Sequence, residues 1–185
     1  MFGRSMCGAV LIGPRLVLGA AHCANADTRF RVGAWEGTSD GYEVAIKESI
    51  VHPEYSSSGF DHDIMMFQLE DETPHPYIKL KKEEVTGGQL TVIGFGDTDI
   101  GPGLSLASTL NEVELDYVDN DRCDDGHGGN GDVTEDMLCA AGNGKDSCIG
   151  DSGGPLFQKG SNADEDELVG LVSWGRGCAL AGYAG

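Results

Sequence analysis

Glycine accounts for 29 of the 185 residues, whereas proline accounts for only 6. The glycines follow no Gly-x-y period, so they indicate tight turns and close backbone approaches and exclude a collagen-like chain. Between them lie short apolar or alternating segments, and no amphipathic helix of any length is evident. Short strands joined by glycine-rich turns predict an all-β fold, either a barrel or a sandwich. The hydrophobic fraction of 39% is enough for one domain, or for two small lobes that share an interface.

Strands are predicted on both sides of a charged connector. Residues 7–18 indicate a hairpin that turns at Gly13-Pro14-Arg15, and residues 79–88, which end in a glycine pair, are interpreted as the connector between two halves. The other predicted strands are 30–35, 42–51, 64–69, 89–95 and 168–174. Three acidic, glycine-containing stretches are predicted to be exposed loops without metal sites: 97–108, 119–131 and 160–167.

The charge of the chain excludes several classes of partner. Twelve basic side chains stand against 31 acidic ones, giving a net charge of −19. Such a surface repels nucleic acids and anionic lipids, so we expect neither as a partner, and the charge itself is most simply explained by solubility or a saline habitat. No apolar run approaches the ~20 residues that span a bilayer, so no membrane association is expected.

Six cysteines are an even number, which permits three disulfides in 15 connectivities. None of them forms a Cys-x-x-Cys motif, so neither zinc-ribbon nor thioredoxin chemistry is supported. The number and spacing of the cysteines favour an oxidising compartment, and we therefore expect a secreted protein.

The segment Lys145–Leu156, KDSCIGDSGGPL, carries the strongest chemical signal. A nucleophilic serine needs a sharp turn that presents its hydroxyl, small neighbours, and amides aimed at the developing oxyanion. Ser152, flanked by Gly150, Gly153 and Gly154, meets those requirements. The sequence therefore predicts a nucleophile at Ser152.

A serine hydroxyl needs a base to take its proton. The five histidines are His22, His52, His62, His75 and His127. His22 is the preferred candidate because it follows a predicted buried strand and precedes Cys23. The others lie before prolines (His52 and His75), in a glycine-rich acidic loop (His127), or between aspartates in a segment expected to be exposed (His62).

The base in turn needs a buried carboxylate that fixes its tautomer. Asp63 opens the apolar run Ile64-Met65-Met66-Phe67, which should draw it inward. Asp61 would face the same way but lies farther toward solvent, so Asp63 is the better candidate.

Over residues 7–185 the chain resembles the chymotrypsin/trypsin family of serine proteases. The resemblance rests on three motifs that carry His, Asp and Ser in that order: Ala20-Ala21-His22-Cys23, Asp63-Ile64-Met65-Met66 and Gly150–Pro155 (GDSGGP). The resemblance implies that Ser152 is the nucleophile, His22 the general base and then acid, and Asp63 the orienting carboxylate. It also implies an oxyanion hole formed by the amides of Gly150 and Ser152. The implied fold is two antiparallel, six-stranded-type β-barrels, residues 1–80 and 81–185, with the second barrel incomplete.

The resemblance also implies the disulfide pairs Cys7–Cys23, Cys123–Cys139 and Cys148–Cys178. It places Asp146 at the floor of a pocket for arginine or lysine, with Ser147 near the floor. Gly175 and Gly185 correspond to the pocket walls, and the segment Ser173-Trp174-Gly175 to the strand that pairs with substrate backbone.

Two features of the resemblance bear on activity. Active relatives have a free apolar N-terminus whose ammonium pairs with the aspartate beside the serine, here Asp151, and residues 1–6 contain no such terminus. Family segments at both ends are therefore expected to lie outside this chain, and a zymogen-like arrangement of the serine loop is expected. We expect no cofactor and no metal, a monomer, and partners that are protein or peptide substrates and protein protease inhibitors. The alternatives are an inactive fragment and a non-catalytic homologue that acts in binding.

Overall fold

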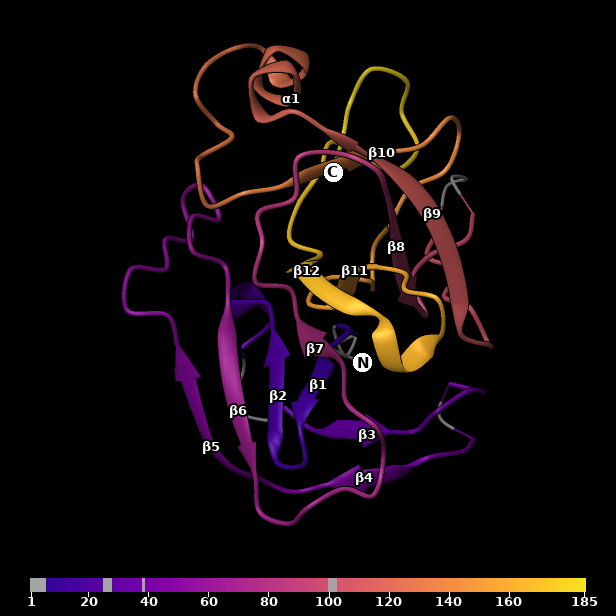
Figure 1. The fold of residues 1–185 in the computed structure, drawn as a ribbon. Helices are drawn as coiled ribbons and strands as arrows, with labels where there is room; N and C mark the ends of the chain where they lie inside the picture. The colour runs from indigo at the N-terminus through magenta and orange to yellow at the C-terminus, as the bar shows by residue number, and fades with distance from the viewer. Residues whose placement is uncertain (1–5, 25–27, 38, 100–102) are drawn as a thin grey trace.

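The computed structural model describes residues 6–24, 28–37, 39–99 and 103–185, and it is built mostly from antiparallel strands (Figure 1). Strands from the first part of the chain form a four-stranded sheet in the order β1-β2-β6-β5. Its members are β1 (Val10–Gly13), β2 (Leu16–Gly19), β5 (Ile46–Val51) and β6 (Met65–Leu69). A separate two-stranded sheet pairs β3 (Phe30–Val32) with β4 (Tyr42–Val44).

The second part of the chain forms a six-stranded sheet in the order β10-β9-β8-β11-β12-β7. Its members are β7 (Lys79–Leu80), β8 (Gln89–Gly94), β9 (Asn111–Val118), β10 (Cys139–Ala141), β11 (Pro155–Gln158) and β12 (Glu167–Leu171). All pairs are antiparallel except β12 with β7. Within the described residues neither sheet closes on itself, but the all-β prediction is confirmed.

Each of the two larger sheets has its own hydrophobic core. In the first sheet the alternation along β6 buries Met65, Phe67 and Leu69, and the ring of Phe30 meets the Phe67 ring edge-on at 4.6 Å. The core of the second sheet consists of Leu90, Val92, Leu115, Ala140 and Leu156. The hairpin expected at residues 7–18 forms as β1 and β2, because Pro14 and Arg15 occupy the turn between two apolar runs.

Two predictions about non-strand segments are corrected. The stretch 119–131, expected to be an exposed loop, contains the eight-residue helix α1 (Asn120–His127). Asp119 caps its N-terminus by accepting from the amides of Asp121 and Arg122, and Gly128 ends it in the left-handed conformation. The connector 79–88 begins with β7, which joins the second sheet. Two single-turn 3-10 helices, η1 (Ala21–Cys23) and η2 (Ala163–Glu165), complete the elements.

Three disulfides anchor the loops, and their pairs match those that the resemblance implies: Cys7–Cys23, Cys123–Cys139 and Cys148–Cys178. The first joins η1 to the chain before β1, and the second fixes α1 to β10. Among the described residues, no helix has the length and apolar character needed to cross a membrane.

Candidate active site

The segment that follows β2 presents His22 on the single turn of η1. The imidazole is part-buried, with 23% of the side chain exposed. Its Nδ1 lies 2.6 Å from Asp63 Oδ2, and its backbone amide donates to Asp63 Oδ1 at 2.8 Å. Because an ionised carboxylate only accepts hydrogen bonds, Nδ1 carries the proton of the neutral ring. His22 Nε2 is therefore left as the acceptor.

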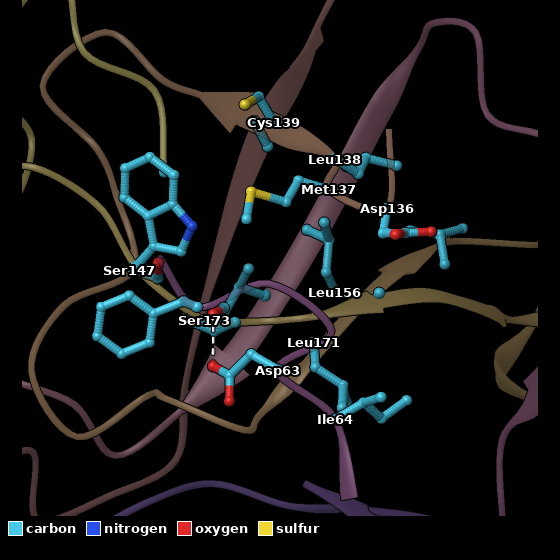
Figure 2. A pocket seen from close by; sticks show the side chains of 18 of the residues that line it. Asp63, Ile64, Asp136, Met137, Leu138, Cys139, Ser147, Leu156, Leu171 and Ser173 are labelled. Atoms are coloured by element: carbon cyan, nitrogen blue, oxygen red, sulfur yellow. Dashed lines mark hydrogen bonds between the residues drawn. The ribbon is translucent and has the colours of Figure 1, made fainter. Parts of the chain in front are cut away.

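Asp63 is held in a nearly closed environment, with only 3% of its side chain exposed. Burial by itself would raise the pKa of this carboxyl, but hydrogen bonds from the His22 ring, the Ser173 hydroxyl and the His22 amide together keep the pKa below its usual value. Ser173 Oγ donates to Asp63 Oδ2 at 2.5 Å, as Figure 2 shows. The sequence analysis assigned Ser173 to substrate backbone pairing only, since no local pattern connects it with a residue 110 positions away.

The turn before β6 aims Asp63 at the histidine. His62 has a φ of 51°, and the amide of Ile64 donates to the His62 carbonyl at 2.7 Å, so Asp63 lies at the centre of a tight turn. Phe60, with a φ of 56°, places its ring edge-on to His22 at 5.5 Å. Positive φ at residues other than glycine is unusual and is found where surrounding contacts enforce it.

Ser152 lies in a turn that depends on two nearby glycines with positive φ. Gly153 has a φ of 80°, and a side chain there would lie 2.5 Å from the carbonyl oxygen of Gly8. The Gly8 amide donates to the Ser152 carbonyl at 2.7 Å, and the Gly154 amide donates to the Asp151 carbonyl at 2.8 Å. Gly150, on the other side, has a φ of 103°. The predicted sharp turn is present, with the chain before β1 packed against it.

The serine loop and the histidine meet at the Cys7–Cys23 disulfide. Cys23 Sγ lies 3.6 Å from His22 Nε2 and 3.7 Å from the Ser152 carbonyl oxygen. Among the described residues, no hydrogen bond joins the hydroxyl of Ser152 to His22 Nε2. Catalytic hydrogen bonds are often long in the absence of substrate. The structure thus joins His22, Asp63 and Ser173 directly and brings Ser152 against the same disulfide.

Asp151 points away from the histidine into the second half. It is 8% exposed and accepts hydrogen bonds from the amides of Gly96, at 2.8 Å, and Cys148, at 3.0 Å. A side chain on Gly94 or Gly96 would collide with this carboxylate. In the part of the chain that the structure describes, no basic group lies within ion-pair distance of Asp151. The carboxylate is instead stabilised by hydrogen bonds from two backbone amides.

A cavity of about 620 Å³ runs beside the site, and its lining includes Asp146, Ser147, Trp174 and Gly185 (Figure 2 shows part of this lining, with Ser147 labelled). Asp146 Oδ2 accepts from the Ala179 amide at 2.9 Å, but Oδ1 is shielded from solvent and has no hydrogen-bond partner among the residues that the structure describes. Burial raises the pKa of this carboxyl, and the charge of Asp151 adds to the rise, against the lowering effect of amides.

The walls of this cavity near Asp146 are made of backbone. A side chain added to Gly185 would lie 3.5 Å from Asp146 Oδ1, and one added to Gly175 would lie 3.3 Å from Gly185 Cα. The two glycines expected at the pocket walls are therefore adjacent, and only their lack of side chains leaves room above the carboxylate.

His127 is a feature of this region that the sequence analysis missed. It was placed in an exposed loop, whereas it ends α1 and is 2% exposed. Its Nε2 lies 2.8 Å from the Ala184 carbonyl oxygen, and its ring lies edge-on to Trp174 at 5.0 Å. His127 therefore supports the backbone wall at 184–185 from behind. Its flanking glycines and acidic residues hid this buried position.

Comparison with known proteins agrees with this architecture. The Trypsin family model matches residues 1–185. Trypsin II-P29 of Gallus gallus is 33% identical over 193 residues, covering 99% of this chain and 74% of that protein. Trypsin 5G1 of Aedes aegypti is 35% identical, covering 97% and 69%, and Trypsin of Simulium vittatum is 36% identical, covering 97% and 74%. The mostly-β architecture with one helix is consistent with a trypsin-like double β-barrel. This chain belongs to the trypsin family of serine endopeptidases.

Proposed function

We propose that this protein cleaves protein and peptide chains after arginine or lysine. The observation that carries the proposal is the unpartnered Oδ1 of Asp146 inside a cavity with glycine walls. A shielded carboxylate oxygen without a donor is unfavourable, and a guanidinium or ammonium group supplies both the missing charge and the missing hydrogen bond. An apolar or acidic side chain would leave that oxygen unpaired and would be rejected.

The proposed reaction is acyl transfer by Ser152, His22 and Asp63. The 2.6 Å contact between His22 and Asp63 fixes the tautomer with Nε2 free to accept the Ser152 proton. The Ser152 oxygen then attacks the peptide carbonyl, and the resulting oxyanion accepts hydrogen bonds from the amides of Gly150 and Ser152. His22 returns the proton to the leaving amine, and water hydrolyses the acyl-enzyme. The residues of the chain supply each step without a cofactor.

The remaining features of the proposal concern substrate, partners and surroundings. The segment 173–175 would pair with substrate backbone as an added strand, and it is tethered to the site by the Ser173–Asp63 bond. Three disulfides support a secreted enzyme. We further propose that it acts as a monomer of two halves, 1–80 and 81–185, and that protein inhibitors bind the same pocket.

The test compares kcat/KM on matched amide substrates with arginine, lysine or phenylalanine before the cut bond. We expect a preference of at least 10³-fold for the basic substrates, and Asp146→Ser should abolish it. Asp164→Ser, a change of the same type on exposed η2, should leave the preference intact. An Asp146→Ser variant that kept its arginine preference would show that the pocket assignment is wrong.

Two observations favour a second candidate, an inactive, zymogen-like form. Ser152 makes no hydrogen bond to His22, and Asp151 has no cationic partner among the described residues. A fluorophosphonate probe distinguishes the two. Covalent labelling of Ser152 supports the active enzyme, whereas absence of labelling in a folded protein that still binds benzamidine supports the inactive form.

A further inference from the structure

Close to the candidate triad, two histidines and three carboxylates form a cluster centred on His62, and both histidines and Asp136 line the cavity. His62 Nε2 lies 3.0 Å from Asp136 Oδ2 and 3.9 Å from Glu54 Oε2. The ring of His52 stacks on that of His62, with centroids 4.7 Å apart and planes 15° apart. His52, Glu54 and His62 each offer one ligand atom, and these atoms lie within 4.8 Å of one another. These three side chains are therefore close enough to gather around one metal ion after small movements.

The other face of His62 supplies the support that metal-bound histidines usually have. Its Nδ1 is shielded from solvent and lies 3.3 Å from Asp61 Oδ2, without the geometry of a hydrogen bond. Asp61 Oδ1 in turn accepts from Thr134 Oγ1 at 2.9 Å. A small rotation of Asp61 would let it accept the Nδ1 proton and leave Nε2 free for a metal. Such carboxylate–histidine pairs orient ligands and raise their basicity.

We propose that His52, Glu54 and His62 form a binding site for Zn²⁺, and that Asp136, which lies beside His62 but not within the group of three, moves in as a fourth ligand. Two imidazoles and carboxylates are a donor set suited to zinc, whereas Ca²⁺ and Mg²⁺ prefer oxygen donors alone. Glu54 and Asp136 have 74% and 56% of their side chains exposed, so they are free to adjust.

Binding also requires the stacked rings of His52 and His62 to turn until a nitrogen of each points at the same ion, and it requires a change in the hydrogen bond of His52. The Glu54 amide donates to His52 Nδ1 at 3.2 Å, which leaves the ring proton on Nε2. A metal at Nε2 needs the proton to move to Nδ1, so this exposed hydrogen bond must open. The loss of one exposed hydrogen bond is small beside the gain from metal–ligand bonds.

The position of the zinc site predicts inhibition, a consequence that rests on the proposed function. His62 immediately precedes Asp63, and the two share the tight turn closed by the Ile64 amide. A metal that draws His62 toward Glu54 would displace this turn and weaken the contact between Asp63 and His22. Zinc bound at this site would therefore reduce turnover without contacting Asp146.

The binding test uses equilibrium dialysis against Zn²⁺ at pH 7.5 with the Ser152→Ala protein, which cannot digest itself. We expect one zinc per chain, an affinity reduced at least tenfold by His62→Gln or Glu54→Gln, and a reduction of about 10–100-fold by Asp61→Asn. Glu84→Gln removes the same charge at an exposed position outside the cluster and should bind as the parent does. Failure to bind one zinc, or unchanged binding by both His62→Gln and Glu54→Gln, would overturn the site whatever the protein's activity.

Two further arms separate this site from the candidate triad. His22→Ala should still bind zinc, and loss of binding there would assign the metal to His22 instead. In the protein with Ser152 intact, Zn²⁺ should inhibit amide hydrolysis reversibly, with recovery on adding EDTA, and His62→Gln should need at least tenfold more zinc. Zinc bound at one per chain without inhibition would refute the coupling to Asp63.

Discussion

Asp146→Asn should make the free protein more stable while removing its affinity for arginine-like ligands. The substitution keeps the shape of the side chain, and the amide oxygen of asparagine can still accept from the Ala179 amide. What disappears is a shielded negative charge at Oδ1, for which the described part of the chain supplies no hydrogen-bond donor. An unsatisfied buried polar group costs about 1–3 kcal/mol, and the asparagine amide keeps part of that cost. We therefore expect a gain of about 1–2 kcal/mol, or about 2–8 °C in Tm for a chain of this size.

The pH dependence of this gain follows from the raised pKa of Asp146. Below the ordinary carboxyl pKa of about 3.9, both folded and unfolded chains are protonated at this position, so parent and variant should differ little. As the pH rises toward the raised folded pKa, the unfolded chain ionises first, and the parent loses stability relative to the variant. Above that pKa the difference should be constant and at its largest.

The assay is thermal unfolding at several pH values between 3 and 8, in a Ser152→Ala background that prevents self-digestion. Benzamidine, whose amidinium resembles a guanidinium, provides the second readout. At 100 times its Kd it should stabilise the parent by about 2.7 kcal/mol and leave Asp146→Asn unchanged. A variant that melts at or below the parent temperature at pH 8, or that is stabilised equally by benzamidine, would refute the argument that the pocket carries an unpaired carboxylate.

Three further substitutions test other parts of the structure. Ser173→Ala removes a donor to Asp63, so the pKa of Asp63 should rise toward its ordinary value. An NMR titration of the Asp63 carboxyl carbon should then report a higher pKa than in the parent, with about a tenfold loss of kcat; an unchanged titration would contradict this. Gly153→Ala should lower the free energy of unfolding in urea by more than ~2 kcal/mol, because the added Cβ would meet the Gly8 carbonyl. The control Gly131→Ala, also at positive φ but in open space, should lower it by about 1 kcal/mol. Equal losses would exclude the steric explanation. Lys159→Ala breaks exposed ion pairs with Glu112 and Glu114. It should change the free energy of unfolding by less than about 1 kcal/mol in the same assay, because exposed ion pairs contribute little to stability. A larger loss would contradict this expectation.

Local sequence was sufficient to predict features that depend on neighbours along the chain. The β1–β2 hairpin follows from two apolar runs around Pro14 and Arg15, and the serine turn follows from the glycines around Ser152. In both cases the residues that determine the backbone lie within a few positions of the feature. The disulfide pairs were different, because the spacing left 15 connectivities open and only the resemblance selected one.

Features that depend on distant contacts were not predicted. The helix α1 is polar and glycine-flanked, so its sequence resembles a loop; its cap at Asp119 and the Cys123–Cys139 disulfide hold it in place. The half-buried position of His62, which was expected to be exposed, arises from residues of the second half that no nearby pattern specifies. The same is true of Ser173, whose partner Asp63 is 110 positions away.

The arrangement around Asp63 depends on contacts between the two halves of the chain. Asp63 belongs to the turn before β6 in the first sheet, while Ser173 follows β12 in the second. The residues just before it make two more such contacts, Asp61 with Thr134 and His62 with Asp136. Three successive residues, Asp61 to Asp63, are thus held by residues that follow β9 along the chain. The orientation of His22 therefore depends on these distant contacts as well as on the tight turn before β6.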